Sequence, residues 1–225
     1  MTLLDFPGHV ACTVFTVGCN FRCPFCHNSA LVGSLPEEET IREEDFFAFL
    51  ESRKKILDGV AVTGGEPLLQ PDIKDFIQKI RAAGYAVKLD TNGSFPEKLK
   101  ELVNEGLVDY VAMDVKNAPA KLAETIGTEK WAAQITESLS FLKSQTRVPF
   151  EFRTTAVHEL HTAEDFAALA GIIAPVDRYF IQCFKDSGAI LEDGLTAPSM
   201  DEMKSFLAAV RPLIPGAEVR GIDLL

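Results

Sequence analysis

Short runs of β-branched and other apolar residues alternate along this chain with longer amphipathic stretches. Short runs of this kind are typical of buried strands. The predicted strands are Ala11–Thr16, Gly59–Thr63, Ala86–Asp90, Asp109–Val115, Phe150–Val157, Tyr179–Phe184 and Glu218–Ile222.

The stretches between these runs carry apolar residues at three- and four-residue spacing, which predicts amphipathic helices. The predicted helices are Glu43–Leu57, Ile73–Ala83, Pro96–Glu105, Thr128–Ser144, Ala163–Ile173 and Met200–Leu213. Gly84 and Gly106 follow two of them at C-cap positions, and Thr162 and Ser199 precede two others at N-cap positions.

This alternation predicts right-handed βαβ units and a parallel α/β sheet, arranged either as a doubly wound sheet or as a barrel. No repeat or linker divides the sequence, so we expect residues 1–225 to form a single domain. In both architectures functional residues gather at the carboxyl ends of the strands. Unusual polar clusters follow or end the first four strands, at 19–26, 64–67, 90–93 and 114–116. Together they predict one site.

Composition narrows the partners of that site. The chain has 22 Lys+Arg against 33 Asp+Glu and a formal net charge of −11, which argues against broad electrostatic binding to nucleic acid or an anionic membrane. No apolar run approaches the roughly 20 residues of a membrane span. Met1 to Asp5 has no basic region of a secretory signal. We therefore expect a cytoplasmic protein with no nucleic-acid or membrane partner.

Three of the five cysteines, Cys19, Cys23 and Cys26, share one segment with the spacing C-x3-C-x2-C. Three thiolates on one short loop converge on a metal centre more readily than they pair as disulfides. The alternatives are reduced structural thiols and a zinc site completed by His27, although structural zinc normally takes two separated ligand pairs. A cubane iron–sulfur cluster usually has four cysteines, so three leave one iron free to bind a substrate or cofactor.

With the aromatic Phe25 before its last cysteine, the segment resembles the C-x3-C-x-Φ-C signature of the radical S-adenosylmethionine (SAM) superfamily. The resemblance implies a partial TIM barrel of the (β/α)6 type that is laterally open. It implies a [4Fe–4S] cluster on Cys19, Cys23 and Cys26, with SAM as the cofactor and Phe25 beside its adenine. The implied reaction is reductive cleavage of SAM to methionine and a 5′-deoxyadenosyl radical.

The second and third polar clusters continue the resemblance in the same order. Thr63-Gly64-Gly65-Glu66-Pro67 is similar to the GGE motif that contacts the methionyl amino group. There Gly64 and Gly65 let the backbone approach closely, and Glu66 accepts a hydrogen bond from the ammonium. Asp90, Thr91 and Asn92 stand where the family binds ribose.

The fourth cluster, Asp114 and Lys116, resembles the D-x-K stretch near the cofactor carboxylate. In the family's activating enzymes, residues equivalent to Asp90 and Asp114 help hold a monovalent cation, so the resemblance implies such an ion here. A mutual ion pair is the alternative for Asp114 and Lys116. Arg153 shares a strand face with Thr155 and is a further candidate for the carboxylate, which an arginine suits.

The flanks of the cysteine segment point to one group within the superfamily. Leu3-Leu4-Asp5-Phe6-Pro7-Gly8 and Cys26-His27-Asn28 are similar to the flanks in glycyl-radical-enzyme activases, above all the activating proteins of anaerobic ribonucleoside-triphosphate reductases. The arginine that activases carry after D-x-P-G has no match here. The resemblance implies a glycyl radical enzyme as partner, whose glycine Cα gives up a hydrogen atom.

An activase with only the three cluster cysteines takes its electron from an external flavodoxin or ferredoxin, and Arg22 and Arg42 are the predicted docking patch. Two other functions stay open. One is a radical SAM enzyme for a small molecule, of the deazaguanine-synthase type, which usually has a longer cysteine loop. The other is a zinc-stabilised interaction module without turnover.

Overall fold

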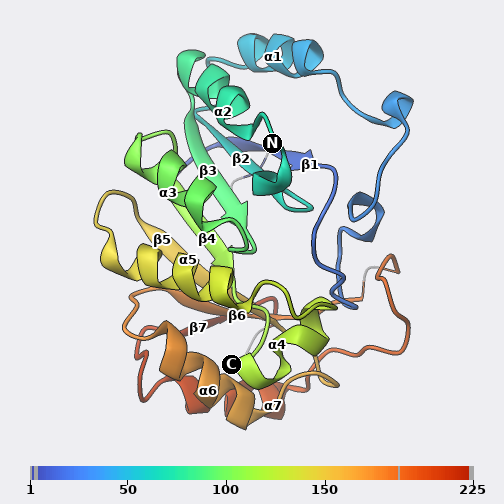
Figure 1. Cartoon of the computed structure of the whole chain (residues 1–225), viewed down its shortest axis with the longest axis vertical. Coiled ribbons are helices and arrows are strands. Elements are labelled where there is room, and N and C mark those ends of the chain that lie inside the picture. Colours follow the sequence, from blue (N-terminus) through green and yellow to red (C-terminus); the bar gives the residue numbers. More distant parts are fainter. Residues whose placement is uncertain (1, 3–4, 187, 223–225) are drawn as a thin grey trace.

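Within the residues that the structure describes, seven strands form one parallel sheet in the order in which they occur along the chain (Figure 1). The structure is a computed structural model, and it describes residues 2, 5–186 and 188–222; Leu3 and Leu4 of the amino-terminal motif lie outside this part. The strands are β1 (Ala11–Thr16), β2 (Gly59–Gly64), β3 (Ala86–Thr91), β4 (Tyr110–Asp114), β5 (Phe150–Ala156), β6 (Tyr179–Cys183) and β7 (Glu218–Arg220).

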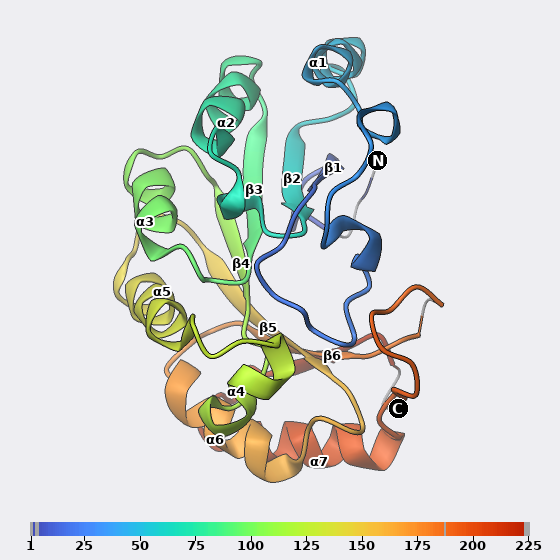
Figure 2. The same ribbon diagram turned by 45° about the vertical axis from the view of Figure 1, so that its right-hand side comes forward.

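Helices connect the strands, and Figure 2 shows most of them in an arc around the outside of the curved sheet. They are α1 (Glu43–Ser52), α2 (Ile73–Ala82), α3 (Pro96–Asn104), α4 (Pro119–Ile126), α5 (Ala132–Ser144), α6 (Ala163–Ile173) and α7 (Met200–Val210), with 3₁₀ turns η1 (Ser29–Leu31), η2 (Glu37–Glu39) and η3 (Pro67–Leu69). In the described part of the chain, no helix has both the length and the apolarity that a membrane crossing requires.

The sheet does not close into a full barrel. β1 pairs with β2 and β7 with β6, and the two end strands do not pair with each other in the described part of the chain. The strand order never reverses, whereas a doubly wound sheet has a reversal point. The expectation of a laterally open partial barrel is therefore confirmed, with a short seventh strand beside the six of a (β/α)6 core.

The two faces of the sheet have different interiors because side chains alternate along a strand. On β4, Val111 and Met113 are fully buried in the core between sheet and helices. Tyr110 instead packs with Phe6 and Ala11 in a second, smaller apolar cluster. Further along the same face of β4 comes Asp114. The Tyr110 hydroxyl also donates to the buried Glu151 at 2.8 Å, so this face carries polar groups along its length.

Most predicted caps are present, and most predicted boundaries hold to within a few residues. Thr162 and Ser199 form capping boxes at α6 and α7, and Gly84 and Gly106 take positive φ after α2 and α3. α1 ends at Ser52, before the predicted Leu57, because the chain turns at 53–57. The pattern missed α4, whose eight residues are too few for a clear periodicity.

Candidate active site

A cavity of about 220 Å³ is lined by residues from the carboxyl ends of the strands and from the loops after them. All four predicted polar clusters contribute to its walls. The lining includes Cys19, Cys23, Phe25, Cys26, Gly64, Gly65, Glu66, Asp90, Thr91, Asn92, Asp114, Lys116 and Arg153. Every residue that the sequence assigned to a cluster or cofactor is therefore brought to one place, together with Thr155 and Gln182.

The cysteine loop presents three reduced thiols to this cavity. Burial raises the pKa of Cys19, and it raises the pKa of Cys23 to about 12, while the nearby charge of Lys116 opposes both shifts. The Phe21 N–H donates to Cys19 Sγ at 3.4 Å, the kind of bond that tunes an iron–sulfur centre. Phe25 is buried with its ring edge toward His161. Thiols buried this deeply require a cationic partner, such as a metal centre, to become thiolates.

The donor set fits a three-cysteine cluster better than a zinc ion. Cys12 and Cys183 are not among the described residues that line the cavity, so no fourth cysteine is present there. His27, the ligand a zinc site requires, stacks on Phe184 with ring centroids 5.4 Å apart, and its Nε2 lies 2.6 Å from the Lys185 carbonyl oxygen. No three His, Cys, Asp or Glu side chains of the described residues converge as a single ion requires.

Asparagine side chains that the sequence analysis did not assign hold the cysteine loop in place. Asn28 Nδ2 donates to the Gly64 carbonyl at 3.0 Å, which ties the loop to the end of β2. Asn20 accepts from Asn92 Nδ2 at 3.0 Å and donates to Ser94 at 2.9 Å, which ties it to the loop after β3. Asn28 belongs to the predicted C-H-N flank, which was a usable signal, whereas nothing in the sequence around Asn20 marks its partners.

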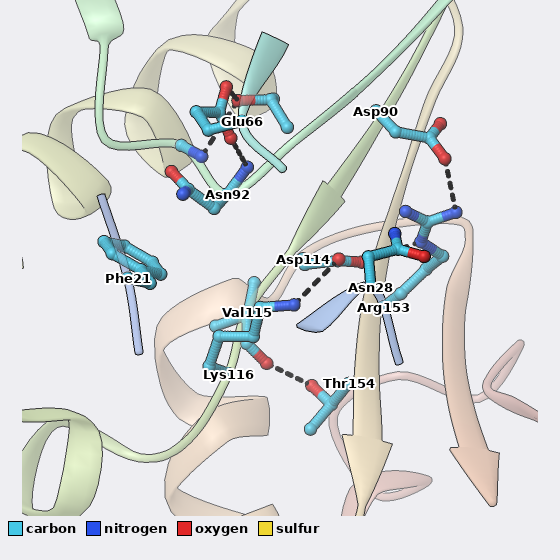
Figure 3. A network of polar contacts seen from close by, with 12 residues as sticks. Phe21, Asn28, Glu66, Asp90, Asn92, Asp114, Val115, Lys116, Arg153 and Thr154 are labelled. Carbon is cyan, nitrogen blue, oxygen red and sulfur yellow. Dashed lines mark hydrogen bonds and ion pairs between the residues drawn. The ribbon is translucent and has the colours of Figure 1, made fainter. Parts of the chain in front are cut away.

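Glu66 is fully buried, and its carboxylate serves the protein's own loops (Figure 3). It accepts from the backbone N–H of Asn92 at 2.7 Å, from Thr91 Oγ1 at 2.8 Å and from the Leu68 N–H at 3.1 Å. Burial raises its pKa to about 7, although these three donors favour the charged form. Beyond the expected contact with an ammonium, Glu66 thus joins the end of β2 to the end of β3.

The two glycines before Glu66 make a close approach to the protein's own backbone. A Cβ at Gly65 would lie 2.1 Å from the Gly18 carbonyl oxygen, immediately before the first cysteine. Gly64 has φ +120°, and a Cβ there would lie 2.3 Å from the Thr16 nitrogen on β1. The close packing of β1, β2 and the cysteine loop therefore requires glycine at both positions, whether or not a ligand is bound.

A chain of alternating charges crosses the carboxyl ends of β3, β4 and β5 (Figure 3). Arg153 Nε lies 2.8 Å from Asp114 Oδ1 and its NH1 lies 3.2 Å from Asp90 Oδ2. Lys116 Nζ lies 2.9 Å from Asp114 Oδ2, so the predicted alternative of a mutual pair is present. Burial raises the pKa of Asp114, but Arg153 and Lys116 outweigh it and hold that pKa well below its usual range.

The expected monovalent cation does not fit these carboxylates. Lys88, which the sequence analysis did not assign, forms an ion pair with Asp90 Oδ1. Each of the four oxygens of Asp90 and Asp114 thereby faces a lysine or arginine nitrogen. A further cation would enter beside three positive side chains that already exceed the two carboxylates, and like charges repel strongly in a partly buried site.

The two arginines predicted as a docking patch have local partners. Arg22 is exposed at the cysteine loop, and its NH1 donates to the carbonyls of Cys19 and Phe21, both at 2.8 Å. Arg42 forms an ion pair with Asp45 in the first turn of α1, with Nε and Oδ2 2.9 Å apart. Arg22 therefore also braces the loop, and Arg42 is already neutralised.

Comparison with known sequences identifies the site. The sequence profile described as the Radical SAM superfamily matches residues 13–170. This chain belongs to the radical SAM superfamily. It is therefore a radical SAM enzyme whose cofactors are a [4Fe–4S] cluster and SAM, and the zinc-stabilised module is excluded.

Its relatives come from several branches of radical SAM enzymes. A protein of Methanocaldococcus jannaschii, named provisionally as a glycyl-radical enzyme activating enzyme, is 29% identical over 99% of this chain and 94% of its own length. A 7-carboxy-7-deazaguanine synthase of Methanopyrus kandleri is 29% identical over 75% of this chain and 82% of its own. The structure of Streptococcus suis SuiB with S-adenosylmethionine has a TM-score of 0.72 at 14% identity over 95% of this chain. The chain spans about half of SuiB, at 51%, so this likeness concerns the fold.

Proposed function

We propose that this radical SAM enzyme is the activating enzyme of a glycyl radical enzyme, and that its partner is an anaerobic ribonucleoside-triphosphate reductase. The observation that carries the proposal is the alignment with the M. jannaschii protein over nearly the whole of both chains. The synthase aligns with a smaller share of this chain. The D-F-P-G and C-H-N flanks and the short cysteine segment support the same choice.

The residues of the cavity have distinct roles in this proposal. Cys19, Cys23 and Cys26 would hold the cluster. The cluster would supply one electron for the cleavage of SAM into methionine and a 5′-deoxyadenosyl radical, and this radical would take a hydrogen atom from the partner's glycine. Lys116 has one N–H on Asp114, and its remaining donors are available to the methionyl carboxylate. Phe25, which is buried in the cavity wall, is proposed to pack beside the adenine of SAM.

The open side of the sheet supports a protein substrate. β1 and β7 do not pair with each other in the described part of the chain, and we infer that the loop with the target glycine enters on this open side. The segment after β6 contacts the cysteine loop on this side, because the Leu191 and Glu192 N–H groups each donate to the Pro24 carbonyl at 3.1 Å.

The electron donor is proposed to be an external flavodoxin or ferredoxin. The sequence has five cysteines, and two of them, Cys12 and Cys183, stand apart from the loop, so there is no second cluster to relay electrons. The exposed guanidinium of Arg22 beside Cys19 is the better candidate contact for an acidic donor. Arg22→Glu should slow reduction by flavodoxin and leave reduction by dithionite less affected.

Anaerobic reconstitution with the host's glycyl radical enzymes tests the function. The reduced enzyme with SAM should release 5′-deoxyadenosine and produce a glycyl doublet in electron paramagnetic resonance on the partner reductase. Cys23→Ser should produce neither signal. SAM cleavage without a glycyl radical on any of these partners, together with turnover of a small molecule, would instead support an enzyme of the synthase type.

A further inference from the structure

We propose that the ammonium group of Lys88 is a built-in cation of the cofactor site, so that this chain binds SAM without a free monovalent cation. The proposal rests on membership of the radical SAM superfamily. It does not depend on whether the substrate is a glycyl radical enzyme or a small molecule.

The position of Lys88 on β3 directs it toward the cofactor end of the concave face. Lys88 precedes Asp90 by two residues, so both side chains lie on the same face of the strand. The side chain is only 3% exposed, and its Nζ forms the ion pair with Asp90. Its register partners on β2 and β4 are Ala61 and Tyr110, neither of which is an acid. A buried ammonium without an anionic partner is costly, so Asp90 is the group that holds this charge in place.

With Lys88 present, every carboxylate oxygen of Asp90 and Asp114 has a positively charged partner. Without it, Arg153 would still occupy one oxygen of each carboxylate, and Lys116 would occupy the second oxygen of Asp114. Asp90 Oδ1 would then face the buried space that the ammonium fills. An unpaired carboxylate oxygen in a buried polar space is a typical ligand for a small hard cation.

The ion-paired side chains at the ends of β3, β4 and β5 favour an anionic ligand group. Among the ion-paired side chains, Lys88, Lys116 and Arg153 carry three positive charges against two on Asp90 and Asp114. Two further carboxyl groups lie close by: Glu66 lines the same cavity, and Glu151 is near Arg153 but is paired with Arg220. All five ion-paired residues except Lys88 line the cavity directly. The methionyl carboxylate of SAM is an anionic group that can pair with these cationic side chains, and its ammonium is expected at Glu66. A free cation would instead add to their positive charge.

Cation dependence of cofactor binding tests the proposal in the reconstituted enzyme. Calorimetric titration with SAM is compared in potassium chloride and in choline chloride of equal ionic strength, because choline is too large for the site. For the wild type we expect the two dissociation constants to agree within about twofold. Lys88→Ala opens the space at Asp90, and its affinity in choline should fall by about tenfold or more and be restored by potassium. Thallium, as a potassium probe, should show line broadening in its nuclear magnetic resonance signal with Lys88→Ala but not with the wild type.

Lys143 provides a matched control on α5. Its Nζ donates to the carbonyls of Ile172 and Ala174 at 2.7 and 3.1 Å, away from the cavity. Lys143→Ala should bind SAM equally in both salts. Two results would overturn the proposal: a wild-type enzyme that needs potassium, or a Lys88→Ala enzyme that is weakened equally in both salts, as a merely structural role requires. If Lys88→Ala does not fold, Lys88→Gln removes the charge with a smaller loss of volume and is titrated in the same two salts.

Discussion

The side-chain amide of Asn92 donates to Asn20 Oδ1 across 3.0 Å, and this bond joins the loop after β3 to the loop that carries the cysteines. The backbone N–H of the same Asn92 donates to Glu66 at 2.7 Å. Three loops that belong to separate βα units are therefore linked through one residue. The position of the cysteine loop is therefore coupled to the positions of Glu66 and Asn92, which line the cofactor cavity.

Removing the amide of Asn20 should loosen the cysteine loop. Asn20→Ala deletes the bonds to Asn92 and Ser94 and leaves a buried amide of Asn92 without its acceptor, which costs about 1–3 kcal/mol. We expect iron loss to a chelator to become several-fold faster and the affinity for SAM to fall. Asn104→Ala, at the exposed end of α3, is the control. Unchanged iron release in Asn20→Ala would mean that the loop holds its shape without this bond.

A methyl group at Gly65 should displace the cysteine loop, because its Cβ would lie 2.1 Å from the Gly18 carbonyl oxygen. We expect Gly65→Ala to lower the free energy of unfolding by about 1–3 kcal/mol and to reduce SAM cleavage at least tenfold. Gly171→Ala is the matched control: it lies inside α6, nothing stands within 4 Å of its Cβ, and it should stabilise the chain by about 0.5–1 kcal/mol. Both effects are measured by urea unfolding. Equal stability of the two variants would contradict the predicted clash.

The buried carboxyl of Glu66 should make stability depend on pH. Burial raises its pKa from 4.5 to about 7, so the folded state holds a proton that the unfolded state has lost. The stabilising contribution is complete below about pH 4.5 and is lost as pH rises through 7, about 3 kcal/mol in total. Glu66→Gln cannot lose a proton and should lack this part of the slope, although its amide N–H opposes a backbone N–H and lowers stability at every pH.

The measurement for Glu66 is urea unfolding of cluster-free protein from about pH 5 to about pH 8, followed by the fluorescence of Trp131. The difference in unfolding free energy between wild type and Glu66→Gln should shrink as pH rises. A difference that stays constant would show that Glu66 is ionised in the folded state throughout this range.

Serine substitutions should divide the cysteines into two groups. Cys19→Ser, Cys23→Ser and Cys26→Ser should each lose the visible absorption of the cluster and reduce SAM cleavage to background, because each removes a thiolate ligand. Cys183→Ser should keep both the visible absorption and SAM cleavage, since Cys183 is not among the described residues that line the cavity. Retention of the cluster in Cys23→Ser would show that another group serves as ligand.

Much of the fold was predictable from the sequence because the physical signals are local. The apolar runs of β2 and β4 and the capping residues Thr162 and Ser199 mark their elements directly. The position of the polar clusters at the ends of successive strands predicted that their residues share one site, and they line one cavity. A parallel sheet places successive strand ends on one side, so this inference needed no tertiary contact.

The bonds within the site were less predictable because they join residues far apart in sequence. The exception is Lys88, which pairs with Asp90 two residues away on the same face of β3. The sequence shows this spacing but not that the Lys88 side chain is buried. Glu66 has the composition of a ligand residue, yet its donors come from the loops after β2 and β3. The monovalent cation was implied by the resemblance at Asp90 and Asp114, whereas the ion pairs of Arg153 and Lys88 with these carboxylates argue against it.

The contacts between the cysteine loop and the segment after β6 also bear on synthesis of the chain. Pro24 accepts from residues 191 and 192, and Ser29 Oγ donates to the Ala189 carbonyl at 2.5 Å. Residues 24 and 29 leave the ribosome some 160 residues before these neighbours. During synthesis the cysteine loop therefore lacks these bonds until the segment after β6 has been translated.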